Sequence, residues 1–145
     1  MARELFVDTS GFYSLLVKRD DQHREASRVL RESRRRKNRF VTTDYVLDET
    51  ATLFKARGQN HLAAVLLDIV FASVACTVHW TDEAWFRATC SFFVKHEDQA
   101  WSFTDCLSFL VMKDRRLSES LTKDAHFQEA GFYPLLMEKK GSRRI

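Results

Sequence analysis

The chain has 145 residues, of which 45% are hydrophobic, so it is long enough for one domain with one apolar core. With four glycines, one proline and 30% charged residues, it is neither collagen-like nor an unstructured linker. The formal charge of +3 permits contact with nucleic acid without indicating it.

No apolar run approaches the roughly 20 residues that span a bilayer. The acidic Glu4 stands where the apolar stretch of a signal peptide would begin. We therefore expect a cytoplasmic protein that does not bind a membrane. The three cysteines are far apart and form no Cys-x-x-Cys pair, so the pattern indicates neither a zinc knuckle nor a disulfide framework.

The first part of the chain alternates short β-type runs with helical patterns. The apolar run before Asp8 is stopped by the turn-forming sequence Asp-Thr-Ser-Gly, which favours a buried strand. Gly58 follows the third helical pattern and is typical of a helix C-terminus. In chain order we predict a strand over Glu4–Asp8, helices over Phe12–Val17 and Asp21–Arg36, a strand over Phe40–Thr43, and a helix over Tyr45–Arg57.

The second part of the chain continues the same alternation. A helix is predicted over His61–Phe71, and β-branched residues favour a strand over Val74–Val78. Two more helices are predicted, one over Thr81–Lys95 and a strongly apolar one over Ser102–Lys113. The last two predicted strands cover Leu117–Thr122 and Phe132–Leu136.

Strands that alternate with helices predict an α/β domain built on a mostly parallel sheet that helices flank. The sequence has no repeat and no linker rich in Gly, Ser or Pro, so we expect one domain. In sheets of this kind, ligand sites form beyond the carboxyl ends of the strands, near a switch in strand order. Acidic residues that follow strands are therefore the first candidates for a site.

Two aspartates directly follow predicted strands. Asp8 ends the first strand, and Asp124 comes just after the strand over Leu117–Thr122. We expect both carboxylates at the carboxyl edge of the sheet. Each residue also has a purely structural alternative, because aspartate is common in turns and at helix N-caps.

Glu49 lies within a predicted helix, where positions three and four apart share a face. That spacing puts Glu49 beside Val46, Thr50 and Leu53, and it turns Asp48 towards solvent. We therefore expect the Glu49 carboxylate within the apolar stripe of the helix. A buried carboxylate needs a metal ion, a proton or a cationic partner, so a metal ligand and a structural ion pair with an arginine are both open interpretations.

Asp105 lies near the start of the apolar helix, three residues after Ser102. This spacing resembles a capping box, which gives Asp105 a structural interpretation at the helix N-terminus. The neighbouring Cys106, Leu107 and Phe109 indicate, however, that the helix begins inside the molecule. The carboxylate of Asp105 would then face the same edge as the other acids.

Four short motifs support a more specific interpretation. They are Val7-Asp8-Thr9-Ser10, the helical Asp48-Glu49-Thr50, Phe103-Thr104-Asp105-Cys106, and Leu121-Thr122-Lys123-Asp124-Ala125-His126-Phe127. In order and spacing these motifs resemble the pattern of the PIN-domain family of nucleases, and the closing Gly131-Phe132 is similar as well. The resemblance extends from Leu5 to about Leu136, and the chain is similar in size to the VapC-type toxins of toxin–antitoxin pairs.

The resemblance implies a PIN-like three-layer domain over residues 1–138, followed by a basic tail over 139–145. It implies an endoribonuclease that holds Mg²⁺ or Mn²⁺ and cleaves RNA. Its catalytic and metal-holding residues would be Asp8, Glu49, Asp105 and Asp124. The implied partners are an RNA substrate, an antitoxin protein and a second copy of the chain in a homodimer. A non-catalytic RNA-binding or scaffold module, and a stand-alone RNA-processing nuclease without an antitoxin, are the alternatives.

Carboxylates suit this chemistry, because Mg²⁺ prefers hard oxygen ligands and keeps several waters. A bound ion lowers the pKa of water, so we expect metal-activated water to attack the phosphodiester bond without a protein nucleophile. The hydroxyls of Ser10 and Thr104 could orient the acids, and His126 could touch phosphate. Helix capping for the hydroxyls and a structural or solvated position for the histidine are the alternatives.

Basic residues must hold the RNA backbone, because an acidic pocket repels RNA until metal fills it. One dense basic run consists of Arg31, Arg34, Arg35, Arg36, Lys37 and Arg39. It is the leading candidate for contact with RNA, and a solvated helix face is the alternative. Arg115 and Arg116 form a second candidate group with the same alternative.

Two other α/β classes that gather acids fit this sequence less well. A receiver domain needs paired acids near the first strand and a late lysine, whereas Asp8 is the one acid that directly follows this strand. A phosphatase of the haloacid dehalogenase kind needs Asp-x-Asp at the same place, and Asp8-Thr-Ser lacks the second aspartate.

Overall fold

Five parallel strands form one sheet in the computed structural model, which describes residues 3–138. The strands are β1 (Glu4–Val7), β2 (Arg39–Thr43), β3 (Cys76–His79), β4 (Glu119–Leu121) and β5 (Tyr133–Pro134). Their order across the sheet is β3-β2-β1-β4-β5. The predicted α/β domain with a parallel sheet is therefore confirmed, and every strand pair is parallel.

The strand order switches beside the central strand β1. The chain first adds β2 and β3 on one side of β1, and it then adds β4 and β5 on the other side. At the switch, the backbone N–H of Asp8 donates a hydrogen bond of 3.2 Å to the carbonyl of Leu121, the last residue of β4. A ligand site is expected beyond the carboxyl ends of these two strands.

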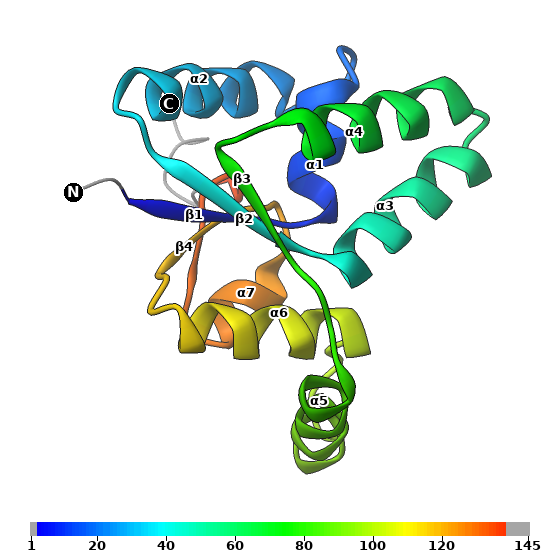
Figure 1. Ribbon diagram of the computed structural model, residues 1–145, viewed down its shortest axis with the longest axis vertical. Coiled ribbons are helices and arrows are strands. Elements are labelled where there is room, and N and C mark those ends of the chain that lie inside the picture. The colour runs from blue at the N-terminus through cyan, green and yellow to red at the C-terminus, as the bar shows by residue number, and fades with distance from the viewer. Residues whose placement is uncertain (1–2, 139–145) are drawn as a thin grey trace.

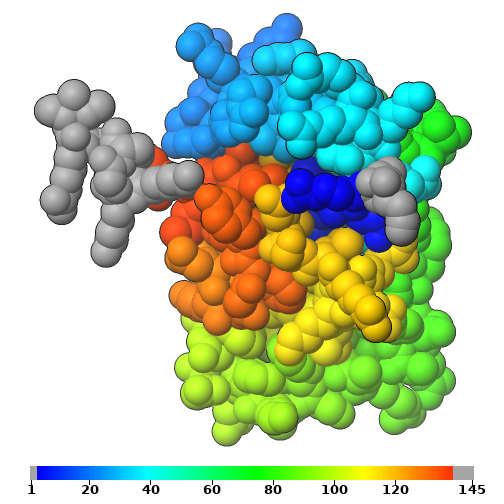
Figure 2. All heavy atoms as spheres, turned by 90° about the vertical axis from the view of Figure 1, so that its left-hand side faces the viewer, coloured from blue at the N-terminus to red at the C-terminus, as the bar shows by residue number. Residues whose placement is uncertain are grey.

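Helices cover both faces of the sheet and make a three-layer domain (Figure 1). In chain order they are α1 (Thr9–Leu16), α2 (His23–Arg35), α3 (Asp44–Ala56), α4 (Asn60–Ala72), α5 (Glu83–Lys95), α6 (Phe103–Asp114) and α7 (Ala125–Glu129). The helices α1, α2 and α4 lie on one side of the sheet, and α6 and α7 lie on the other, with α5 packed on α6. Figure 2 shows α2 above, β1 in the middle, and the α5–α6 region below.

The core is built from the strand residues and the helix faces that cover them. Leu5, Phe6 and Val7 of β1 are all buried, as the short apolar run predicted. On the α6–α7 side, the ring of Phe127 lies 5.0 Å from that of Phe109 and 6.2 Å from that of Phe6. Full burial of such a side chain contributes roughly 1.5–3 kcal/mol, so this packing fixes the layers that carry the acids.

Gly11 allows α1 to approach β4 closely. A Cβ atom at this position would lie 2.0 Å from the carbonyl oxygen of Leu121, which belongs to the backbone. Because backbone cannot move aside cheaply, a larger residue would push α1 away from the strand. This close approach brings the residues that follow β1 next to those that follow β4.

Most predicted elements agree with the structure to within two residues at each end, but two helices differ more and two strands are shorter than predicted. The helix α1 begins at Thr9 rather than Phe12, and β4 is three residues shorter than the predicted Leu117–Thr122. The edge strand β5 keeps two of its five predicted residues. The helix α7 was not predicted, because five residues are too few to show a helical period.

Within the described residues, no helix is long and apolar enough to cross a membrane. The predicted basic tail over 139–145 lies outside the described residues, so the prediction for it stays untested.

Candidate active site

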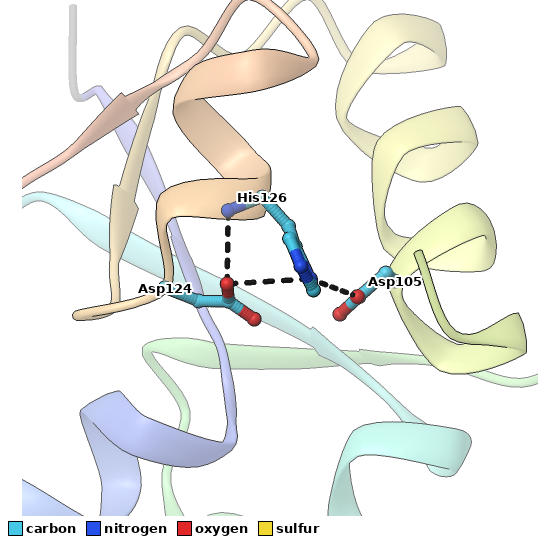
Figure 3. A group of neighbouring side chains, drawn as sticks. All are labelled: Asp105, Asp124 and His126. Atoms are coloured by element: carbon cyan, nitrogen blue, oxygen red, sulfur yellow. Dashed lines mark hydrogen bonds and ion pairs between the residues drawn. The ribbon is translucent and has the colours of Figure 1, made fainter. Parts of the chain in front are cut away.

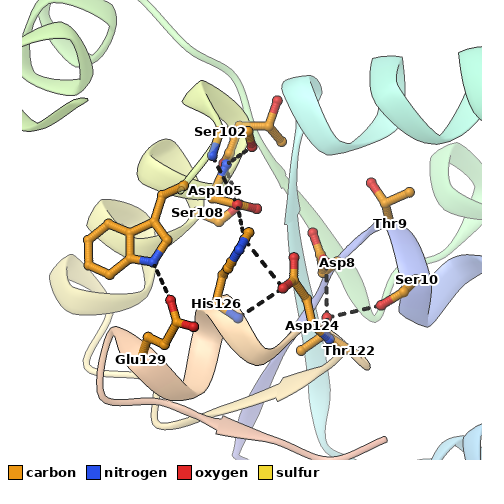
Figure 4. Close-up of polar contacts among 12 residues, drawn as sticks. Asp8, Thr9, Ser10, Ser102, Asp105, Ser108, Thr122, Asp124, His126 and Glu129 are labelled. Atoms are coloured by element: carbon orange, nitrogen blue, oxygen red, sulfur yellow. Dashed lines mark hydrogen bonds and ion pairs between the residues drawn. The ribbon is translucent and has the colours of Figure 1, made fainter. Parts of the chain in front are cut away.

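Asp8 directly follows β1 and is buried, with 4% of its surface exposed. Its Oδ2 accepts a hydrogen bond of 3.0 Å from the hydroxyl of Thr122, which follows β4 (Figure 4). Burial raises the pKa of Asp8 from 3.8 to about 7, although hydrogen bonds from the Thr9 backbone and Thr122 oppose the rise. The negative charges of Asp105 and Glu49 also raise it. Asp8 thus lies in a crowded acidic site, as predicted.

The Thr122 hydroxyl connects three segments around Asp8. It accepts a 3.0 Å hydrogen bond from the backbone N–H of Asp124, and it lies 3.0 Å from the hydroxyl of Ser10. The Ser10 hydroxyl in turn accepts a 2.8 Å hydrogen bond from the backbone N–H of Lys123. These contacts fix the ends of β1 and β4 relative to each other.

Asp105 fills two roles at the N-terminus of α6. The Ser102 hydroxyl accepts a 3.0 Å hydrogen bond from the Asp105 N–H, and Oδ2 of Asp105 accepts a 3.1 Å hydrogen bond from the Ser102 N–H. The capping box suggested by the sequence is therefore confirmed. The carboxylate is also buried beside other acids, and burial, helped by the charge of Asp124, raises its pKa above the ordinary value.

His126 lies between two of the acids (Figure 3). Its Nδ1 is 3.0 Å from Oδ2 of Asp105 and 3.4 Å from Oδ1 of Asp124, and the same Oδ1 accepts a 2.9 Å hydrogen bond from the His126 N–H. Burial lowers the pKa of His126, but the hydrogen bond to Asp105 and the charge of Asp124 outweigh it, so the pKa is raised. Ligand atoms of these three residues lie within 4.8 Å of one another and could hold a metal ion.

Glu49 lies on the expected side of α3, but it is not buried. The inward positions are taken by Val46 and Thr50, whereas both Glu49 and Asp48 are exposed. The prediction of a buried Glu49 was therefore wrong, because this side of α3 opens onto a cleft. The Glu49 Oε1 accepts a 2.7 Å hydrogen bond from the Thr9 hydroxyl, which fixes the carboxylate towards the end of β1.

An open cleft of about 380 Å³ lies beside these acids. Its lining residues are Asp8, Thr9, Ser10, Tyr13, Asp20, Glu49, Leu53, Arg57, Lys123 and Asp124. Asp105 and His126 lie outside this lining, and Asp124 belongs both to the cleft and to the group with Asp105 and His126. The four predicted acids therefore gather at one end of the sheet, with Asp124 as the link between the two groups.

Some polar residues of the site were misjudged from the sequence. The hydroxyls that reach the acids belong to Thr9 and Thr122, whereas Ser10 reaches Asp8 through Thr122. Among residues 3–138, the Thr104 hydroxyl makes no hydrogen bond with any of the four acids. His126, for which the sequence suggested contact with phosphate or a structural position, instead contacts two of the acids, and its place two positions after Asp124 was the signal that could have identified this.

The basic groups suggested from the sequence lie at the other end of the sheet. Arg39 is the first residue of β2, and Arg115 pairs at 2.7 Å with Glu4, the first residue of β1. The acids, by contrast, follow the last residues of β1 and β4. Contact of these cations with RNA is untested, and it would occur away from the acids.

Comparisons with known proteins agree with this geometry. The sequence model of the PIN domain family matches residues 5–133. The 23S rRNA-specific endonuclease VapC20 of Mycobacterium tuberculosis, from strains CDC 1551 and H37Rv, is 30% identical over 132 residues, which cover 88% of this chain and 95% of the relative. The crystal structure of the same bacterium's VapC20, a sarcin–ricin loop cleaving toxin, superposes with a TM-score of 0.77 at 27% identity and with the same coverage. This chain belongs to the PIN domain family.

Proposed function

We propose that this protein is an endoribonuclease that depends on Mg²⁺ or Mn²⁺ and hydrolyses phosphodiester bonds of RNA. The main support is the group of Asp105, Asp124 and His126, whose ligand atoms lie within 4.8 Å of one another close to the buried Asp8. Membership in the PIN domain family, and similarity to an endonuclease of 23S rRNA, also support it. The carboxylate oxygens of this group fit a hard divalent cation.

The proposal assigns roles to the four acids and to two of the hydroxyls beside them. The residues that would hold the metal are Asp8, Glu49, Asp105 and Asp124. A bound ion supplies an activated water and neutralises charge on the attacked phosphate. The hydroxyl of Thr122 orients Asp8, and that of Thr9 orients Glu49. Because burial raises its pKa to about 7, Asp8 is only partly ionised near neutral pH, and a bound cation would displace the remaining proton.

Ribosomal RNA is the first substrate to test, because the relative VapC20 is named for its action on 23S rRNA. An enzyme with this substrate would act in the cytoplasm. Intact ribosomal RNA and an unrelated single-stranded RNA would be incubated with the protein in Mg²⁺, Mn²⁺ or excess EDTA, and new ends would be mapped by primer extension. We expect cleavage with either metal and a loss of about a hundredfold in Asp8→Asn.

Two outcomes would contradict this function. Cleavage that persists in excess EDTA would exclude a metal-dependent mechanism. Tight RNA binding without cleavage under any metal would favour the non-catalytic RNA-binding module.

We also propose an antitoxin partner, and its docking surface would be an apolar groove on the α1–α2–α4 side of the sheet. The groove has a volume of about 460 Å³. Its apolar walls come from α1, α2, α4 and the segment before β3, and they include Leu15, Leu16, Leu30, Leu66, Ile69, Val70 and Val74. Two of these side chains, Ile69 at 51% and Val74 at 90%, are exposed together, so apolar surface at the groove is open to a partner.

The charge around the groove indicates the chemistry of the partner. Arg34, Lys37 and Arg39 line its rim. Arg35 and Arg36, in contrast, pair with Glu32 on the outer side of α2. Among the ion pairs of residues 3–138, none involves the three rim cations. A partner segment that carries acidic residues between apolar ones would therefore complement this surface.

The expected homodimer is part of the same proposal. Phe86 and Phe93 of α5 are exposed, and both pack against Phe103 in a continuous aromatic surface. Exposed aromatic surface of this kind is typical of an interface between copies. Light scattering after size-exclusion chromatography should give twice the mass of one chain, and the double change Phe86→Ser and Phe93→Ser should give the mass of one chain.

A further inference from the structure

The acidic cleft is also lined by a cation, Arg57, which has no role in the proposed metal chemistry. Arg57 lies at the C-terminus of α3 and lines the cleft together with Asp8, Glu49 and Asp124. Its guanidinium lies over the ring of Tyr13, with Cζ 4.8 Å from the ring centroid. In the part of the chain that the structure describes, no carboxylate forms an ion pair with Arg57. Its charge is therefore available to a ligand in the cleft.

Lys123, the other cation in the lining of the cleft, already forms ion pairs with carboxylates. Its Nζ lies 2.8 Å from Oδ1 of Asp20 and 2.7 Å from Oδ1 of Asp21. Although burial lowers the pKa of Lys123, its hydrogen bonds to Asp20 and Asp21 raise it, so the ion pairs are favourable. A phosphate would have to compete with two carboxylates for Lys123, whereas Arg57 has no carboxylate to release.

The position of Arg57 is fixed by the way α3 ends. Gly58 adopts a φ of 71°, and the N–H of Gln59 donates a 2.8 Å hydrogen bond to the carbonyl of Phe54, as in a Schellman motif. The ring of Tyr13 stacks on Phe54 with centroids 5.5 Å apart, and its hydroxyl donates a 3.4 Å hydrogen bond to Gln59. Tyr13 therefore supports both the helix end and the guanidinium of Arg57.

We propose that Arg57 binds a phosphate of the RNA backbone next to the bond that is cleaved, and that Tyr13 is a positioning residue for its guanidinium. This inference rests on the proposed function of the cleft. A guanidinium presents paired donors that match two phosphate oxygens, and its positive charge offsets the repulsion between the acids and RNA. The contact would hold the backbone in register with the acids.

The test measures binding of a fluorescent single-stranded RNA by anisotropy, over a range of salt, in an Asp8→Asn background that blocks cleavage. We expect Arg57→Gln to raise Kd about tenfold, as the loss of one charge-assisted contact predicts. The slope of log K against log salt should become shallower by about 0.7, the value for one phosphate on a single strand. Arg57→Lys should keep the slope, because it keeps the charge.

Lys55→Gln is the matched control, because Lys55 is exposed on the same helix and does not line the cleft. It removes the same charge and should leave the slope unchanged. Tyr13→Leu should weaken binding when Arg57 is present and have no further effect in Arg57→Gln. Calorimetric titration with Mn²⁺ of the same variants with Asp8 intact should give unchanged metal affinity, which separates RNA contact from damage to the acidic site.

Equal slopes for Arg57→Gln and Lys55→Gln would overturn the inference. An equal effect of Tyr13→Leu with and without Arg57 would overturn the positioning role. If the wild type lacks metal-dependent cleavage but Arg57→Gln still weakens RNA binding, the proposed function alone fails. If cleavage is metal-dependent and Arg57→Gln behaves like the control, this inference alone fails.

Discussion

The hydroxyl of Thr122 donates a 3.0 Å hydrogen bond to Oδ2 of Asp8, although the two residues are 114 positions apart in the sequence. The hydroxyl oxygen of Thr122 also accepts a 3.0 Å hydrogen bond from the backbone N–H of Asp124. One buried hydroxyl thus joins the carboxyl ends of β1 and β4 at the switch in strand order. Two of the acids depend on it for their relative positions.

Replacing Thr122 by valine tests this connection, because valine has nearly the same shape without the hydroxyl. Asp8 would lose a hydrogen bond that lowers its pKa, so we expect that pKa to rise further. RNA cleavage should fall about tenfold to a hundredfold, as for other groups that orient metal ligands. Thr122→Ser keeps the hydroxyl and should retain most activity. Equal cleavage rates for the valine and serine variants would show that the hydroxyl has no role.

The stability of the metal-free protein should decrease as the pH rises from about 4 to about 7. The pKa of Asp8 is about 7 in the folded chain and 3.8 ordinarily, so the folded state binds the proton more tightly and loses this advantage as the proton leaves. The loss amounts to on the order of 4 kcal/mol over this range. The raised pKa of Asp105 acts in the same direction, and the raised pKa of His126 adds a further loss of stability above about pH 6.5.

Urea unfolding in EDTA at several pH values measures this effect. Asp8→Asn removes the titrating carboxyl, so its unfolding free energy should depend much less on pH between 4 and 7. A wild-type unfolding free energy that stays constant or increases over this range would contradict the prediction.

Two substitutions of Asp105 separate its role as a cap from its role as an acid. In Asp105→Asn the amide oxygen can still accept the Ser102 N–H, while the negative charge is lost. The metal-free protein should therefore be as stable as the wild type or more stable, and added Mn²⁺ should no longer stabilise it. Asp105→Ala also breaks the capping box and should cost about 1 kcal/mol. Thermal unfolding with and without Mn²⁺ measures both effects, and a large loss of metal-free stability in Asp105→Asn would show that capping dominates.

Glu49 and Asp48 are adjacent and both exposed, yet Glu49 alone of the two lines the acidic cleft. Glu49→Gln should lower metal-dependent cleavage about tenfold to a hundredfold, because it removes a charged ligand beside Asp8. Asp48→Asn makes the same chemical change outside the cleft and should leave cleavage nearly unchanged. The reverse order of the two cleavage rates would mean that Glu49 is not a metal-holding residue.

The basic run on α2 and β2 should affect partner binding more than RNA binding. Arg34, Lys37 and Arg39 line the apolar groove, so changing these three to Gln should weaken binding of the proposed antitoxin, with the product of a small neighbouring gene as the protein to test. Changing Arg35 and Arg36 to Gln is the control, because both pair with Glu32.

RNA salt dependence decides between the two interpretations of the run. If Arg34, Arg35 and Arg36 all contacted phosphates, changing them to Gln would flatten the slope of log K against log salt by up to about two units. We expect an unchanged slope and an unchanged Mn²⁺ affinity.

The sequence by itself determined the order of elements and the positions of three acids. Alternation of apolar runs with helical periods is a local property, so it predicted the parallel α/β domain without knowledge of contacts. Asp8 and Asp124 follow strands, and Asp105 begins a helix, and these positions follow from the same local pattern. In a parallel sheet the carboxyl ends of the strands share one edge, which brought the acids together.

Tertiary structure alone decided the exposure and the partners of the individual side chains. Helical spacing predicted the side of α3 on which Glu49 lies. Whether Glu49 is buried depends on what packs against that side, and the structure has an open cleft there. His126 lies among the acids because it contacts Asp105, which is 21 positions away in the sequence and lies on α6, whereas His126 lies on α7. The free state of Arg57 and the paired state of Lys123 likewise depend on segments distant in the chain. Such contacts arise from the packing of whole elements, and no local period of the sequence encodes them.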